Sequence, residues 1–319
     1  MTASVTALLA VTIASPDPEG LSELLQRGLG WQVLGEGSLS AAHERQWGIA
    51  PRSAGPRWRI LHAPGTTRGM IRLVGGSERP RSRPFAARWA GVEMVVAERL
   101  DELWTELQAY AAFRPWKAPV TTDWSQFGSN RHRAIVGRTP GNTHLALTMA
   151  LTRPQGRDFP AATARVGHIF ELPLITADFV RSRAFYGDVF GMTAILSSSF
   201  DRGQWHALWD LADGVPVRLD ILKGDAPGTG LGGIELTGYD AALIDPEPAE
   251  RERFDGGCCM VSYVTPDIEA AFRTLAQDPR ATVLSEPHAI DDDVYRGIRC
   301  CAFLGPDGER MELLSTPWT

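Results

Sequence analysis

The stretch VGHIFELPLITADFVRSRAFYGDVFGM, from Val166 to Met192, decides the fold expected for this chain. Its apolar first part predicts a strand, and Asp178 to Phe190 then places apolar side chains along one helical face. Gly191 follows where a helix commonly ends. His168 lies on the predicted strand and is the first candidate for metal or proton chemistry.

The same order of elements, a strand, a helix and three further strands, is predicted four times along the chain. The intervals Met94–Asp101 and Met260–Asp267 are equal in length and lie 166 residues apart (94 to 260). Pro140 and Pro306 share this offset. The chain is therefore expected to be a duplicated pair of units, with a polar linker over Thr152 to Ala162.

Two segments are less clear within this scheme. Ser38 to Ile49 has no decisive pattern, and Trp205 to Leu211 is predicted as an early strand of the third unit. The four cysteines form two adjacent pairs, on strand-like runs. Because neighbours on a strand point to opposite faces, we expect buried reduced thiols here, with zinc binding as the alternative.

The composition narrows the classes of function. The chain has 319 residues and a formal net charge of −6, without a basic run. It therefore lacks the basic face that nucleic-acid binding needs. No apolar run reaches the length of a membrane helix, so we expect a cytoplasmic protein that does not bind membranes.

Two phrases, HIFELPLITADFVRSRAFYGDVFGM and FLGPDGERMELLS, give the chain a family resemblance. Their order and spacing resemble the vicinal oxygen chelate superfamily, which includes glyoxalase I, bleomycin-resistance proteins and extradiol dioxygenases. The resemblance implies an α+β fold of four βαβββ modules, arranged as two paired-module domains with U-shaped mixed-sheet clefts. We expect residues 1–152 to form a scaffold domain without metal ligands, and residues 163–319 to carry the active site.

The resemblance places divalent-metal ligands on the first and last strands of each module. In the second half these places hold His168, Glu235, Met260 and Glu312. In the first half they hold approximately Ala10, Arg72, Met94 and Ala146. The implied metal ligands are therefore His168, Glu235 and Glu312, which suit Zn²⁺, Mn²⁺, Fe²⁺ or Ni²⁺. A thioether at Met260 is a poor fourth ligand, and Arg72 could instead form an internal charge pair.

Other side chains are candidates for proton transfer or substrate contact. We expect catalytic roles for Glu235, Glu312 and Tyr295. The candidates for substrate binding are Trp205, His206, Trp209 and Arg299. Each could instead be structural or lie on the surface.

Three functions remain open from the sequence. The first is a metal-assisted isomerase or lyase that acts on a small oxygenated molecule, aromatic or carbonyl-containing. The second is a metal-independent protein that sequesters an aromatic drug, which the ten tryptophans would suit. The third is an extradiol-type dioxygenase, although Met260 stands where that class has a second histidine. The expected partner is a small molecule, and a homodimer is one possible assembly.

Overall fold

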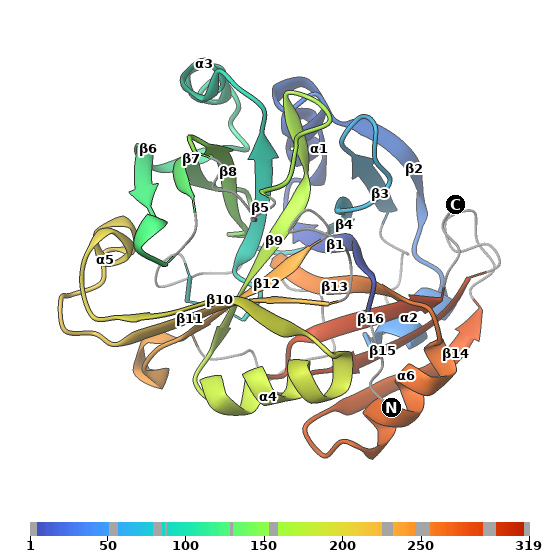
Figure 1. Cartoon of the computed structure of the whole chain (residues 1–319). Coiled ribbons are helices and arrows are strands. Elements are labelled where there is room, and N and C mark those ends of the chain that lie inside the picture. The colour runs from blue at the N-terminus through green and yellow to red at the C-terminus, as the bar shows by residue number, and fades with distance from the viewer. Residues whose placement is uncertain are drawn as a thin grey trace.

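A computed structural model describes residues 5–50, 57–78, 85–86, 88–127, 130–152, 159–224, 232–245, 256–289 and 298–315. Sixteen strands form two eight-stranded mixed sheets (Figure 1). The strands are β1 (Ala7–Ser15), β2 (Gln32–Ser38), β3 (Arg57–His62), β4 (Met70–Gly75), β5 (Gly91–Val96), β6 (Arg114–Asp123), β7 (Arg131–Arg138), β8 (His144–Ala150), β9 (Val166–Thr176), β10 (Thr193–Phe200), β11 (Val217–Lys223), β12 (Gly233–Gly238), β13 (Gly257–Thr265), β14 (Thr282–Ala289), β15 (Arg299–Leu304) and β16 (Arg310–Ser315).

Short helices connect these strands. They are α1 (Pro18–Glu23), α2 (Ala41–Trp47), α3 (Leu100–Leu107), α4 (Phe179–Phe190), α5 (Gln204–Trp209) and α6 (Ile268–Gln277). A π-helical turn (Leu24–Gly28) extends α1, and two 3-10 turns span Ser125–Phe127 and Ala241–Leu243. The strand order confirms the α+β fold of four βαβββ modules: module 1 holds β1–β4, module 2 β5–β8, module 3 β9–β12 and module 4 β13–β16.

The pairing of the modules differs from the expected one. Sheet A has the order β14-β15-β16-β13-β1-β4-β3-β2, so it joins module 1 to module 4. Sheet B has the order β10-β11-β12-β9-β5-β8-β7-β6 and joins module 2 to module 3. Each cleft therefore takes one module from each half of the chain, instead of residues 1–152 and 163–319 each forming a cleft of their own. The antiparallel pairs β1–β13 and β5–β9 join the two modules in the middle of each sheet.

A shared hydrophobic core joins the two sheets. It includes Val11 and Ile13 from sheet A together with Leu172, Leu174 and Ile234 from sheet B, all buried. Because side chains alternate along a strand, the residues between these core positions face the two clefts. The cleft side of each sheet has its own cluster of buried apolar residues.

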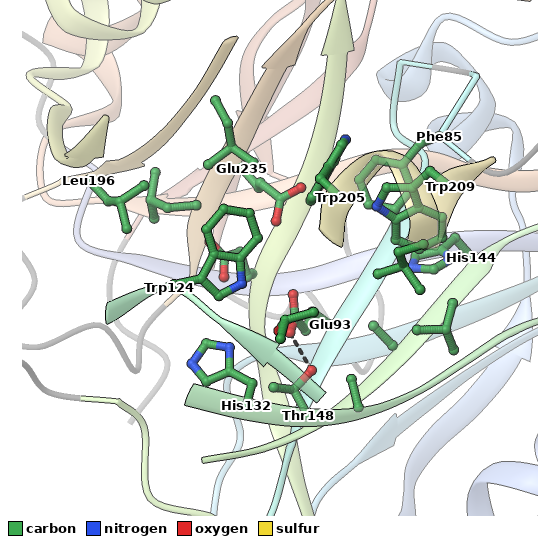
Figure 2. A pocket seen from close by; sticks show the side chains of 18 residues that line it. Phe85, Glu93, Trp124, His132, His144, Thr148, Leu196, Trp205, Trp209 and Glu235 are labelled. Atoms are coloured by element: carbon green, nitrogen blue, oxygen red, sulfur yellow. Dashed lines mark hydrogen bonds between the residues drawn. The ribbon is translucent and has the colours of Figure 1, made fainter. Parts of the chain in front are cut away.

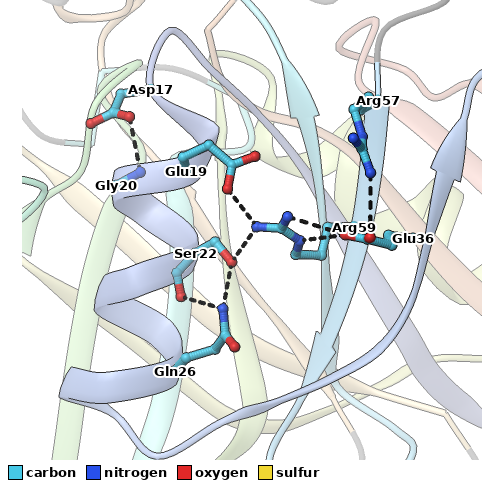
Figure 3. A network of polar contacts seen from close by, with 8 residues as sticks. All are labelled: Asp17, Glu19, Gly20, Ser22, Gln26, Glu36, Arg57 and Arg59. Carbon is cyan, nitrogen blue, oxygen red and sulfur yellow. Dashed lines mark hydrogen bonds and ion pairs between the residues drawn. The ribbon is translucent and has the colours of Figure 1, made fainter.

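A polar network fixes module 1 at its start (Figure 3). Asp17 caps α1 by accepting a hydrogen bond from the backbone N–H of Gly20 at 2.9 Å. Arg59 on β3 donates to Glu19 of α1 at 2.8 Å and to Glu36 of β2 at 3.1 Å. The helix and two strands of the module are thereby linked through one guanidinium.

Two short helices replace segments whose structure the sequence did not settle. The prediction of a strand over Trp205 to Leu211 is wrong, because residues 204–209 form α5. The segment Ser38 to Ile49, which had no decisive sequence pattern, contains α2 (Ala41–Trp47). Both helices connect the second and third strands of their module, and both end at a residue with positive φ, Gly48 and Asp210. Within the described ranges, no helix combines the length and the apolar character needed to cross a lipid bilayer.

Candidate functional site

Three glutamates gather on the cleft side of sheet B. Glu93 lies on β5, Glu171 on β9 and Glu235 on β12, and one carboxylate oxygen from each lies within 4.8 Å of the others. Figure 2 shows Glu93 and Glu235 pointing into the cleft from different strands. The strand register explains the meeting: Glu93 pairs with Glu171, and Gly233, two residues before Glu235, also pairs with Glu171.

Burial has a large effect on these carboxyl groups. It raises the pKa of Glu93 to about 7 and that of Glu171 to about 8, and it holds the pKa of Glu235 well above its usual range. The charges of the neighbouring glutamates raise the pKa values of Glu171 and Glu235 further, whereas Lys223 lowers that of Glu171. Three acids this close cannot all ionise cheaply in a buried place.

Hydrogen bonds satisfy only part of the cluster. The hydroxyl of Thr148 donates to Glu93, and the hydroxyl of Thr237 donates to Glu235 at 3.4 Å. The buried Oε1 of Glu171 has no hydrogen-bond partner among the described residues. None of the described side chains that line the cleft is Lys or Arg. The cluster therefore presents oxygen ligands to the cleft, and the charge of Lys223 acts on Glu171 from outside the lining.

The walls of the cleft are mostly aromatic and aliphatic. The hollow encloses about 110 Å³, and its aromatic lining consists of Phe85, Trp124, Trp205 and Trp209 (Figure 2). Phe85 stacks on Trp209 with ring centroids 4.2 Å apart and meets Trp205 edge-on. The cleft thus combines an acidic floor with an aromatic wall.

Two histidines line the same cleft. Burial lowers the pKa of His132 to about 4 and that of His144 to about 3, so both rings are neutral near pH 7. The charge of Arg138 lowers the pKa of His144 further. A neutral imidazole can donate one hydrogen bond and accept another, but it supplies no positive charge.

The chain was compared with protein families, curated proteins and solved structures. No family model and no curated protein matches it. Glyoxalase I from Zea mays matches the structure with a TM-score of 0.64 at 14% sequence identity, over 97% of this chain and 92% of that protein. This chain has the vicinal oxygen chelate fold. A candidate dioxygenase from Bacillus subtilis subsp. subtilis str. 168 matches with a TM-score of 0.62 at 9% identity, over 98% of this chain and 86% of that protein.

The three glutamates lie on first or last strands of their modules, where the resemblance implied ligand places. β5 is the first strand of module 2, and β9 and β12 are the first and last strands of module 3. Of the three expected ligands only Glu235 lies in this cluster, and Glu93 lies in residues 1–152, which were expected to lack metal ligands. Glu93 stands one residue before the expected Met94, and Glu171 stands three residues after His168. Met94 is fully buried in the core between the sheets.

His168 does not join the cluster. It is 9% exposed on β9 and lies against the loop before β4, where a Cβ on Gly69 would come within 3.1 Å of the His168 Cβ. It is not among the described residues that line the sheet B cleft. Register shifts between β5 and β9 fall around Met94, so simple alternation from His168 misplaces the residue that faces the cleft.

Glu312 belongs to the other sheet. On β16 it accepts a hydrogen bond from Ser262 at 2.7 Å and one from the indole N–H of Trp47 at 3.0 Å, and it pairs with Arg72 at 3.4 Å. Arg72 also donates to Thr12 at 3.1 Å and lies over the ring of Trp47. The expected convergence of His168, Glu235 and Glu312 is therefore not what the structure shows. The internal charge pair expected for Arg72 is present, and its partner is Glu312.

The remaining candidates lie in three different places. Trp205 and Trp209 line the sheet B cleft, although from a helix. His206 is not among the described residues that line this cleft. Its Nε2 lies 2.7 Å from the carbonyl oxygen of Val215. Arg299 is exposed on β15 of sheet A and donates to the carbonyl of Pro287 at 2.8 Å. Tyr295 lies outside the described residues.

Proposed function

We propose that the sheet B cleft is the active site of a divalent-metal-assisted enzyme, of isomerase or lyase type, that acts on a small oxygenated organic molecule. The observation that carries this proposal is the cluster of Glu93, Glu171 and Glu235, whose oxygens lie within 4.8 Å of one another. Its buried, partly unpartnered carboxyl groups fit a bound cation, because a cation offsets the cost of ionising neighbouring acids.

The donor set also bears on the kind of ion. All three ligands are carboxylates, which suit hard ions such as Mn²⁺, whereas imidazole suits Zn²⁺, Ni²⁺ and Fe²⁺ better. Of the four ions expected from the sequence, Mn²⁺ therefore fits best. A bound divalent ion would polarise a carbonyl or enolate oxygen of the substrate.

Proton transfer would come from the same cluster. Burial raises the pKa of Glu93 to about 7 in the metal-free site, so this carboxyl group can accept or release a proton near neutrality when its oxygen is not held by the ion. The hydroxyl of Thr148 holds the Glu93 carboxyl group in its orientation by a hydrogen bond. Apolar side chains surround the acidic floor, including Leu208 and Trp209 of α5. A general acid or base at this place suits the isomerase or lyase chemistry proposed.

Calorimetric titration of metal-free protein with MnCl₂ at pH 8 tests the proposal. We expect one ion per chain in the wild type and a loss of binding in Glu171→Gln and Glu235→Gln. Glu36→Gln is the matched control, since Glu36 lies on the surface in an ion pair with Arg59. Wild-type protein that binds no divalent ion would sink the metal-assisted enzyme.

A metal-independent binding protein is the second candidate. The aromatic wall favours it, because flat organic molecules gain affinity from such surfaces. In this case Glu171→Gln would leave ligand affinity unchanged. An extradiol dioxygenase has less support, since the resemblance implies two histidines and one glutamate, and the cluster here consists of three glutamates.

A further inference from the structure

The helices α2 and α5 occupy equivalent places in the two clefts, and they differ in the hydrogen bonding of their last tryptophan. In sheet A, α2 ends in Trp47, directly before a residue with positive φ, and the indole N–H of Trp47 donates to Glu312 at 3.0 Å. In sheet B, α5 ends in Trp209, again directly before a residue with positive φ. The Nε1 of Trp209 is buried, yet it has no hydrogen-bond partner among the described residues. A buried donor without a partner is unfavourable and points to a missing acceptor.

The missing acceptor can be located by comparing the last strands of the two modules. Glu312 on β16 pairs with Ala302 on β15, and Ala146 on β8 pairs with Val136 on β7 in the same way. Ala146 therefore stands where Glu312 stands in sheet A. Its methyl group leaves free the space that a carboxylate would fill, and Ala146 lines the cavity. His144, two residues earlier, lies edge-on to Trp209 at 4.8 Å.

We propose that helix α5 is the roof of a binding site for an uncharged, single-ring molecule, and that an oxygen atom of this molecule accepts the indole N–H of Trp209 in the space above Ala146. This inference rests on the proposed function, because it assigns the substrate class of the same cleft. The ligand oxygen takes the place that the Glu312 carboxylate takes in sheet A. Trp209 is then a specificity-determining residue.

The size of the hollow limits the ligand. A hollow of about 110 Å³ is of the order of the apolar cavities of about 150 Å³ that bind benzene, so it suits a single-ring organic molecule. Phe85, Trp124 and Trp205 supply the apolar surface around such a ring. Trp205 brings a second buried indole N–H without a described partner.

The described lining of the cleft offers no cation to an anionic ligand. No described lining residue is Lys or Arg, and both lining histidines are neutral near pH 7. Three ionised glutamates are offset by one divalent cation together with Lys223, whose charge acts on Glu171, so the loaded site has no surplus positive charge for an anion. An anionic ring would lose its hydration there without a cation to replace it. An uncharged ring with an acceptor oxygen avoids this cost.

Helix α5 of module 3 is held against β6 of module 2 by hydrogen bonds and an ion pair. Trp116 on β6 donates to the carbonyl of Leu208 at 3.0 Å, and the side chain of Gln204 exchanges two 2.7 Å hydrogen bonds with the backbone of Asp123. Lys117 on β6 pairs with Asp210 at the end of α5. Since α5 belongs to module 3 and β6 to module 2, these contacts link the two modules of sheet B, and α5 lies beside β6 in Figure 1.

Benzamide and benzoate form a matched pair of probes, one uncharged and one anionic, with the same number of non-hydrogen atoms. Calorimetric titrations are made with and without saturating Mn²⁺. We expect benzamide to bind the Mn²⁺-loaded protein at least about tenfold more tightly than benzoate. Trp209→Phe keeps the ring and removes the N–H, and should weaken benzamide binding about fivefold. Trp104→Phe, on α3 outside the cleft, is the control and should change nothing.

Ala146→Leu provides a second test that leaves every residue of α5 unchanged. The larger side chain fills the space proposed for the ligand oxygen, so benzamide binding should be lost while Mn²⁺ binding persists. Equal affinity for benzoate, or unchanged benzamide affinity in both Trp209→Phe and Ala146→Leu, would overturn the inference. A wild-type protein that does not bind Mn²⁺ would instead refute the proposed function. The benzamide and benzoate titrations without Mn²⁺ would still test the binding site under α5.

Discussion

Replacing Glu171 by glutamine is expected to stabilise the metal-free protein, and only at alkaline pH. Between the usual glutamate pKa and about 8, the folded protein holds more protons on Glu93 and Glu171 than the unfolded chain does. The stability supplied by this protonation is complete below about pH 4.5 and is lost as pH rises through 7 and 8. Above pH 8 the folded protein must hold both carboxylates ionised.

The size of the effect follows from the geometry. Two unit charges 4.8 Å apart, the limit for the oxygens of this cluster, repel by about 3.5 kcal/mol at an effective dielectric constant of about 20. Glu171→Gln removes this repulsion. We therefore expect the variant to be more stable than the wild type by on the order of 3 kcal/mol at pH 8.5, and by much less at pH 5.

Urea unfolding in EDTA at pH 5 and pH 8.5, followed by circular dichroism, measures the difference. Adding Mn²⁺ at about 1,000 times its dissociation constant should reverse the order at pH 8.5, because ligand binding stabilises the wild type by about 4.1 kcal/mol and leaves the variant unchanged. Glu36→Gln controls for the loss of a surface carboxylate. A variant that is less stable than the wild type in EDTA at both pH values would refute the reasoning.

Several further outcomes follow from the same contacts. Arg72→Met should destabilise the protein by about 3–5 kcal/mol in urea unfolding, because it leaves Glu312 buried without its ion-pair partner, and the double variant with Glu312→Leu should recover part of this loss. Trp47→Phe removes one hydrogen bond to the same carboxylate and should cost about 1–3 kcal/mol by the same measurement. Mn²⁺ affinity of the wild type should rise between pH 6 and pH 9, since the ligands must lose their protons first; affinity that does not change with pH would argue against these ligands. Cys301 is buried and its pKa is raised to about 12, so it should react with a thiol reagent only after unfolding, whereas the half-buried Cys259 should react faster.

The strands and most helices could be predicted from local patterns, but the partners of the modules could not. The four modules present similar apolar faces, and local periodicity contains no term for which module lies beside which. The pairing of β1 with β13 joins residues from module 1 and module 4, such as Ala7 and Val264. Such contacts depend on the whole fold, so they escape a reading of one segment at a time.

Only Glu235 of the three predicted ligands lies in the glutamate cluster. Glu312 was misassigned because the modules pair differently from the expected way, and His168 because of backbone irregularity. A register shift beside Met94 changes which side chains of β5 and β9 face the cleft. The missed signal was the pair of acidic residues inside apolar strands, Glu93 and Glu171, since a charge in a buried strand calls for a partner.

Helix α5 was missed for a different reason. Trp205, Leu208 and Trp209 recur at helical spacing, which favours a helix over the predicted strand. Tryptophan is also common in strands, and a six-residue segment is too short for periodicity to decide between them. Contact with β6, which lies far away in sequence, is what secures this helix.

Anomalous X-ray scattering from crystals grown with Mn²⁺ tests the proposed metal site most directly. We predict one strong peak per chain, between the carboxylates of Glu93, Glu171 and Glu235 in sheet B. No peak is expected in sheet A, where the guanidinium of Arg72 already neutralises Glu312. A peak at Glu312 or His168, or no peak at all at saturating Mn²⁺, would contradict the assignment of the three glutamates as the metal ligands.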